Sequence, residues 1–179
     1  MTPLLPTRQS IFFLLLVLCI LLHGCASTKK PKPGVKVGMH IDAVLEFIVE
    51  YPLSWSKDRR LTYGSKDGEV RWTHPDHPDT LLTIKSELQK RQELSQEQQV
   101  EQVLHKYVGL EVATKEAISL PAGETWHITG NTAQANVDIY LLLHKDRSYL
   151  IALTAPADKI DAYEDLMNRV TQSFQALPE

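Results

Sequence analysis

Two apolar runs near the carboxyl end constrain the fold of this chain more than any other feature. Residues Ile139–Leu143 and Tyr149–Leu153 are almost continuously apolar, and the polar segment Lys145-Asp146-Arg147 lies between them. A short polar turn between two such runs predicts a β-hairpin. Strands without polar alternation are typical of the centre of a sheet that is covered on both faces. We therefore expect a central hairpin with other elements packed on each side of it.

The rest of the chain predicts further strands and two helices. Residues 95–108 and 157–177 have apolar side chains at three- and four-residue spacing, which predicts amphipathic helices. Ser95 and Gln98 have the form of a capping box at the start of the first helix. The expected strands are Val44–Tyr51 (with a helix over Asp42–Val49 as the alternative), Arg60–Tyr63, Val70–Thr73, Leu81–Ser86, Glu111–Leu120, Thr125–Gly130, Ala135–His144 and Ser148–Ala155. This order predicts a single α+β domain with an antiparallel sheet and helices packed against it.

The amino terminus has the layout of an export signal. A short polar stretch with one positive side chain, Arg8, precedes an apolar run from Ile11 to Leu22. The run is twelve residues long, whereas a helix needs about 20 apolar residues to cross a hydrocarbon core. Residues 1–24 are therefore expected to be a cleaved signal peptide.

The sequence Leu22-His23-Gly24-Cys25 resembles the lipobox of bacterial lipoproteins. The resemblance implies cleavage between Gly24 and Cys25 and attachment of acyl chains such as palmitate to Cys25. Two or three chains hold a protein firmly at a membrane, because each buried methylene contributes about 0.8 kcal/mol. The lipoprotein is expected to face the periplasm. Ala26 resembles the residue that permits transfer to the outer membrane, so the outer membrane is favoured over the inner one if the cell is Gram-negative. An ordinary signal peptide that is cut elsewhere is the alternative.

Residues 25–40 are expected to form a flexible tether between the lipid and the folded domain, which we place at residues 41–179. The segment has no apolar periodicity, and Lys29, Lys30 and Lys32 are interspersed with Pro31 and Pro33. Such a composition is typical of an extended linker. Its lysines either contact anionic lipid headgroups or are simply solvated.

The net charge limits the classes of partner that the domain can bind, and the cysteine count limits how the fold can be stabilised. The formal net charge of −3 becomes −4 when Arg8 leaves with the signal. Nucleic-acid binding requires a basic surface, so no nucleic-acid partner is expected. Cys19 belongs to the signal and Cys25 is consumed by lipid, so the domain is expected to be stabilised by its core without a disulfide.

Three short segments, in this order, resemble a known fold. They are Tyr51-Pro52-Leu53-Ser54-Trp55, Tyr149–Pro156 and Val170–Phe174, and they are similar to the "yP-x-x-W" opening, the last strand and the "SF" helix end of the PsbP-like fold. This fold is shared by photosystem accessory proteins, a Ran-binding protein group and DcrB-like bacterial envelope lipoproteins. The resemblance spans about Leu45 to Leu177 and implies a non-catalytic accessory or assembly role. Trp55 is expected to close the edge of the core.

A histidine-rich turn is the one candidate for metal chemistry. In His74-Pro75-Asp76-His77, two imidazoles and a carboxylate lie within four residues. Zinc sites use three or four ligands, so a third would have to come from elsewhere, for example from His127 or His144. The flanking prolines favour a stiff turn instead. We assign no metal and no cofactor, and we expect His105, His127 and His144 to be polar residues on solvent faces.

The leading functional hypothesis is a membrane-anchored envelope lipoprotein that binds a protein partner as a non-catalytic accessory or assembly factor. No nucleophile elbow G-x-S-x-G and no phosphate loop G-x-x-x-x-G-K-[ST] occurs, so no enzymatic activity is expected. The alternative is a binding module for a small or cell-wall ligand, with a cleft beside the sheet near Trp55, Trp72 or Trp126. An enzyme of unrecognised type ranks third.

Overall fold

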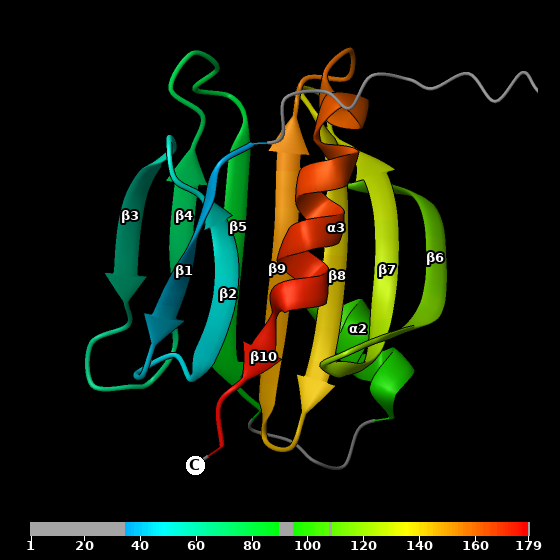
Figure 1. The fold of residues 1–179 in the computed structure, drawn as a ribbon. Helices are drawn as coiled ribbons and strands as arrows, with labels where there is room; N and C mark the ends of the chain where they lie inside the picture. The colour runs from blue at the N-terminus through cyan, green and yellow to red at the C-terminus, as the bar shows by residue number, and fades with distance from the viewer. Residues whose placement is uncertain (1–34, 90–94, 108, 179) are drawn as a thin grey trace, which may run out of the picture. The chain divides into compact units, whose positions relative to one another are not determined.

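The computed structural model describes residues 35–89, 95–107 and 109–178. Its larger sheet has seven strands, all paired antiparallel, in the order β3-β4-β5-β9-β8-β7-β6 (Figure 1). These strands are β3 (Ser56–Leu61), β4 (Gly68–Thr73), β5 (Leu81–Leu88), β6 (Glu111–Leu120), β7 (Gly123–Asn131), β8 (Asn136–His144) and β9 (Arg147–Ala155). The expected α+β class with an antiparallel sheet is confirmed.

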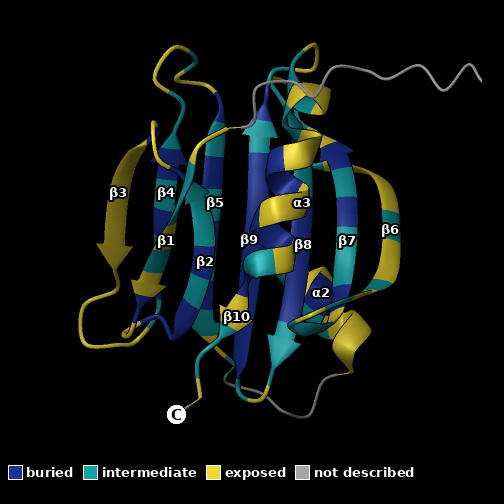
Figure 2. Cartoon of the chain, in the orientation of Figure 1, coloured by how far each residue is buried: buried dark blue, intermediate teal, exposed yellow. Residues whose placement is uncertain are grey.

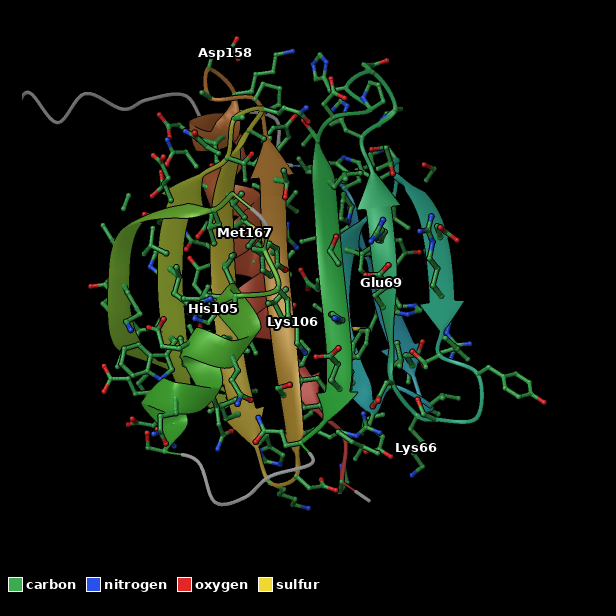
Figure 3. The ribbon with its side chains drawn as sticks, turned by 180° about the vertical axis from the view of Figure 1, so that it is seen from behind. Lys66, Glu69, His105, Lys106, Asp158 and Met167 are labelled. Atoms are coloured by element: carbon green, nitrogen blue, oxygen red, sulfur yellow. The ribbon has the colours of Figure 1, made fainter. Side chains whose placement is uncertain are left out.

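A smaller sheet and the helices cover the two faces of the large sheet. The front face, toward the viewer in Figure 1, carries the smaller sheet and a helix that lies over β8 and β9. The back face carries a second helix, which Figure 3 shows from behind. The front elements are β1 (Val37–Asp42), β2 (Phe47–Pro52), the 3-10 helix η1 (Ile160–Tyr163), α3 (Glu164–Ser173) and β10 (Gln175–Ala176), and the back helix is α2 (Gln96–Leu104). In the described residues, no helix has the length and apolar character needed to cross a membrane.

The hairpin of β8 and β9 forms the centre of the domain, as the apolar runs predict. Alternate residues of β9 enter two separate cores, and Figure 2 shows this strand buried along most of its length. Tyr149 and Ile151 belong to the front core, which α3 and β2 complete with Met167 and Phe47. Leu150 belongs to the back core beneath α2. The hairpin is therefore covered on both faces.

Helix α2 begins where the capping box predicts. The Ser95 side chain accepts a hydrogen bond from the backbone of Gln98, and the Gln98 side chain accepts one from the backbone of Ser95. Val100 and Leu104 are buried against the sheet. Gly109 follows α2 in the sequence and has a φ of 76°, a left-handed conformation that suits glycine.

The carboxyl-terminal segment differs from the single helix expected over residues 157–177. The chain makes a turn and a 3-10 helix first, and α3 ends at Ser173. Phe174 is extended and fully buried, with its ring 5.8 Å from that of Phe47. Gln175 and Ala176 then pair with β2. Burial of Phe174 and strand pairing thus replace the last helical turn.

Strand β1 was not expected, and the domain begins at Val35 instead of residue 41. The usual pattern of a surface strand is inverted here. Met39 and Ile41 are exposed, whereas Asp42 is buried and the His40 ring packs against those of Phe47 and Trp72. The part of the expected tether from residue 37 onward is therefore strand.

The boundaries of β3 and β2 also differ from the expectation. β3 lies earlier than the expected strand and is exposed along its whole length, so it has no apolar face to mark it. Strand β2 begins only at Phe47, because the Asp42 carboxylate accepts hydrogen bonds from the backbone of Val44 and Leu45 and forms a turn. The helical alternative for Asp42–Val49 is wrong.

Glu46 links the small sheet to the central hairpin. It adopts a left-handed φ of 61°, and its carboxylate binds Arg147 Nε and Lys66 Nζ, each at 2.8 Å. Its carbonyl accepts hydrogen bonds from the Tyr149 hydroxyl and the Leu177 backbone. Arg147 is only 3% exposed. The charges of Arg147 and Glu46 therefore compensate each other inside the protein, and the exposed Lys66 adds a second cation from the surface.

We expect Arg147→Met to lower the free energy of unfolding by about 3 kcal/mol, because it leaves the carboxylate of Glu46 without its buried partner. Urea unfolding of the two proteins measures the difference. Arg60→Met is the matched control, because Arg60 pairs with Asp58 at the exposed edge, where an ion pair contributes under about 1 kcal/mol. Equal losses in both variants would contradict the role assigned to Arg147.

Candidate functional site

The histidine-rich turn lies between β4 and β5. The Nδ1 atoms of both imidazole rings already have partners within the protein. The rings of His74 and His77 are stacked with centroids 4.8 Å apart. His74 Nδ1 accepts a hydrogen bond from the backbone of Asp76, and His77 Nδ1 lies 3.2 Å from Lys159 Nζ. Burial and the neighbouring His77 lower the pKa of His74. Across the described ranges, no three His, Cys, Asp or Glu side chains are grouped so that they could hold a metal, so neither His127 nor His144 supplies a third ligand.

The other predicted positions are dispersed. Gly24 and Cys25 lie outside the described residues. His105 is exposed at the end of α2, where its backbone caps the helix. His144 is half-buried at the end of β8, opposite Arg147.

The tryptophans do not form the cleft that the alternative hypothesis placed beside them. Trp72 is fully buried and Trp55 is 5% exposed, both in the front core, which confirms Trp55 as a core residue. Trp126 is half-buried on the back face below Lys115 Nζ. The hollow beside Trp126 has a volume of about 30 Å³, which is about the share of one water molecule in the liquid.

A larger cavity opens on the front face, between α3 and strands β7 and β8. Its volume is about 670 Å³, within the range of ligand sites, about 300 to 1,000 Å³. We call it the front cavity. It is lined by Ala113, His127, Thr129, Gly130, Asn131, Asn136, Val137, Asp138, Tyr140, Leu153, Ile160, Asp161, Glu164, Met167 and Asn168.

The packing of α3 explains why this cavity exists. Leu166, Met167 and Val170 anchor the helix over the front core formed with β8 and β9. The front faces of β7 and β6 lie beyond the helix (Figure 1). Front-facing side chains of β7, such as His127 and Thr129, therefore border an open space.

A histidine network crosses three strands at the floor of the front cavity. His127 Nε2 lies 2.8 Å from Asp138 Oδ1, and His127 Nδ1 lies 3.3 Å from Glu116 Oε1. The strand register places Glu116 and Tyr140 opposite His127 on its two neighbouring strands. The hydrogen bond with Asp138 raises the pKa of His127. The protonated imidazole is thus favoured in the fold.

Tyr140 brings an unused hydroxyl group to the same cavity. Its ring stacks on His127 with a centroid distance of 4.4 Å, and the residue is only 8% exposed. Burial and the charges of Asp138 and Glu164 raise the pKa of Tyr140 to about 12, so the phenol stays neutral. No described residue forms a hydrogen bond with its hydroxyl.

The permanently charged groups in the lining of the front cavity are all negative. Asp138, Asp161 and Glu164 are in its lining, which includes no lysine or arginine. Asp161 and Glu164 are exposed and form no ion pair with any residue that the structure describes. The one lining group that can become positive is His127.

A second cavity, on the back face, differs because its charges are already paired. Its volume is about 300 Å³, and Glu69 and Lys106 are in its lining (Figure 3). Glu69 binds Arg71 at 2.7 Å, and Glu87 binds Lys85 at 2.7 Å and Lys106 at 2.8 Å. These groups need no ligand, so the front cavity is the better candidate.

Sequence reasoning placed His127 on a solvent face and did not single out Asp138 or Tyr140. Asp138 stands between the apolar residues Val137 and Ile139 of β8, two positions before Tyr140, so Asp138 and Tyr140 lie on one face. That alternation was the available signal. It marks a polar patch but does not identify Glu116 or Glu164 as its neighbours.

We expect protonated His127 to stabilise the fold, because the pKa of His127 is raised in the native state. This contribution is complete below the unfolded-state pKa of about 6.5 and is lost as the pH rises through the higher folded-state value. Urea unfolding should therefore show the largest deficit of His127→Gln in acid and a smaller one at alkaline pH. The exposed His105→Gln is the control. A deficit that grows with pH would contradict the assignment.

Comparison with known proteins supports the observed fold. It does not show a closer relationship to any family. No family model matches the chain, and no curated protein matches it. The solution structure of cyanobacterial PsbP (CyanoP) from Synechocystis sp. PCC 6803 is similar, with a TM-score of 0.62 and 12% identity. That match covers 86% of this chain and 99% of CyanoP.

Two further solved structures show weaker similarity. LpqN, involved in cell envelope biogenesis of Mycobacterium tuberculosis, has a TM-score of 0.47 and 14% identity, covering 83% of this chain and 88% of LpqN. A protein of Bacteroides thetaiotaomicron VPI-5482 has a TM-score of 0.44 and 14% identity, covering 79% of this chain and 48% of that protein. The likeness to CyanoP shows that this domain has the PsbP-like fold.

Proposed function

We propose that this chain is a bacterial envelope lipoprotein whose domain binds a protein partner at the front cavity, as a non-catalytic accessory factor. Two features support the proposal: the lipobox-like sequence that ends at Cys25, and a PsbP-like domain with a polar cavity beside α3. In this proposal residues 1–24 are removed and the domain faces the periplasm, with the outer membrane favoured in a Gram-negative cell.

The observation that carries the binding role is a set of polar groups in the front cavity, the hydroxyl of Tyr140 and the carboxylates of Asp161 and Glu164, that have no partner among the described residues. The Tyr140 hydroxyl has no hydrogen-bond partner among the described residues. Tyr140 is 8% exposed and lines the cavity, and its hydroxyl is not one of the buried unpartnered atoms, so the oxygen is open to the cavity. A partner that fills the cavity would form a hydrogen bond with this hydroxyl and would meet the carboxylates of Asp161 and Glu164.

The chemistry of the lining supports binding over covalent catalysis. Nucleophilic catalysis uses an activated side chain next to a base. The lining contains neither serine nor cysteine, and the imidazole of His127 is held between two carboxylates. The arrangement suits recognition of a ligand.

The short distance along the chain between the proposed lipid and the domain limits where a partner can lie. The folded unit begins at Val35, ten residues after Cys25. An extended proline-rich linker of that length reaches about 30 Å. The proposed partner is therefore itself at, or close to, the membrane surface.

A small-ligand binding role is the second candidate, and the volume of the front cavity favours it. A space of about 670 Å³ can hold a small molecule. The position differs from the earlier expectation, because the cavity lies beside Tyr140 and His127 and not beside Trp55 or Trp72.

Affinity capture from detergent-solubilised envelopes tests the proposed partner site. We expect the lipidated protein to retain a specific partner and Asn168→Arg to lose it, because a bulky side chain at the cavity wall blocks entry. Asp165→Arg is the control, because Asp165 is exposed on the same helix outside the lining. Equal capture by both variants, or no specific capture by the parent, would overturn the partner site.

The lipid is tested in the same preparations by labelling with a palmitate analogue. Cys25→Ser should prevent labelling and leave an unprocessed precursor, whereas Cys19→Ser should still be labelled. Labelling of Cys25→Ser would show that the anchor is assigned to the wrong residue.

A further inference from the structure

We infer that the front cavity binds an organic cation, either an ammonium or a guanidinium group. The inference rests on the proposed function for the position of the binding site, and it adds the chemistry of the occupant. The group comes either from a lysine or arginine side chain of the partner or from a free amine.

Unbalanced negative charge is the first argument. Asp138, Asp161 and Glu164 come from three different elements and line one cavity without a lysine or arginine. His127 is paired with Asp138, which leaves the carboxylates of Asp161 and Glu164 without a cationic partner among the described residues. The back cavity shows the contrast, because its glutamates already hold basic side chains. A positive ligand would complete the front cavity in the way that Lys106 completes the back one.

The hydroxyl of Tyr140 is the second and independent argument. The residue is nine-tenths buried, lines the cavity and has no hydrogen-bond partner among the described residues. A phenol oxygen accepts hydrogen bonds from ammonium and guanidinium groups. The ring is held by stacking on His127, so the oxygen is fixed in position before a ligand arrives.

The size and the walls of the cavity favour an organic cation over a metal ion. A volume of about 670 Å³ far exceeds what a bare ion fills. Leu153, Ile160 and Met167 form apolar parts of the wall. Such surfaces pack against the methylene stem of a lysine or arginine while the charged end reaches polar groups. The described residues provide no cluster of metal ligands at this position.

His127 makes the affinity depend on pH. When protonated, the imidazole occupies Asp138 and Glu116 and competes with the incoming cation. Binding should therefore strengthen as the pH rises through the folded-state pKa of His127. The titratable and charged groups that face or border this space are His127, Glu116, Asp138, Tyr140, Asp161 and Glu164.

NMR titration of the mature, lipidated protein in non-ionic detergent tests the inference with defined probes. We use N-acetyl-arginine amide, a short arginine-containing peptide and spermidine, and N-acetyl-citrulline amide as the uncharged control of the same shape. The cations should shift the amide signals of His127, Asp138 and Asn168, and citrulline should not. Binding should be stronger at alkaline than at acid pH.

Two pairs of variants distinguish binding in the front cavity from general electrostatic attraction to the protein surface. Glu164→Gln should weaken binding about threefold or more, as expected for loss of one exposed charge contact. Asp165→Asn removes the same charge from the next residue, outside the lining, and should leave the affinity unchanged. Tyr140→Phe should also weaken binding, whereas Tyr163→Phe should not.

The outcomes distinguish this inference from the proposed function. Equal binding of arginine and citrulline, or equal effects of Glu164→Gln and Asp165→Asn, would overturn the inference even if a partner is still captured. Binding of spermidine with no partner captured would support the cation site and overturn the partner proposal. Binding of the arginine peptide in preference to spermidine would support a side chain of the partner as the source.

Discussion

The hairpin of β8 and β9 is the constraint on which the rest of the structure depends. Its strands are apolar on both faces, so each face has to be removed from water. Burying a large apolar side chain contributes about 1.5 to 3 kcal/mol, and Tyr149, Ile151 and Leu150 are each at most 4% exposed. The front is covered by α3 and the small sheet, and the back by α2. Both faces of the hairpin are thereby removed from water.

The candidate site exists because α3 and the small sheet cover only part of the front face of the large sheet. Helix α3 lies over β8 and β9, and β7 is left beside it with polar side chains on its front face. The paired charges of Glu46 and Arg147 hold the small sheet at the other side of the helix. The domain therefore combines a hairpin that is buried on both faces with a front cavity lined by three carboxylates, which is the ligand site that we propose.

The sequence predicts this architecture where burial follows a simple period. The central hairpin and the capped start of α2 are examples, because apolar spacing and Ser95 mark them directly. β1 escaped prediction because the two residues that it turns toward the core, the half-buried His40 and the buried Asp42, are polar. The cavity escaped prediction because Glu116, His127 and Asp138 meet only through the register of three strands. Lipid attachment at Cys25 remains a sequence prediction.

Site-specific photo-crosslinking in growing cells tests the central claim, that the front cavity is the surface through which the domain works. A photoreactive phenylalanine derivative is placed at Asn168, which lines the cavity, or at Asp165, which is exposed outside it. The account predicts a discrete cross-linked product from position 168 and none from position 165. Products of equal yield from both positions, or from position 165 alone, would contradict it.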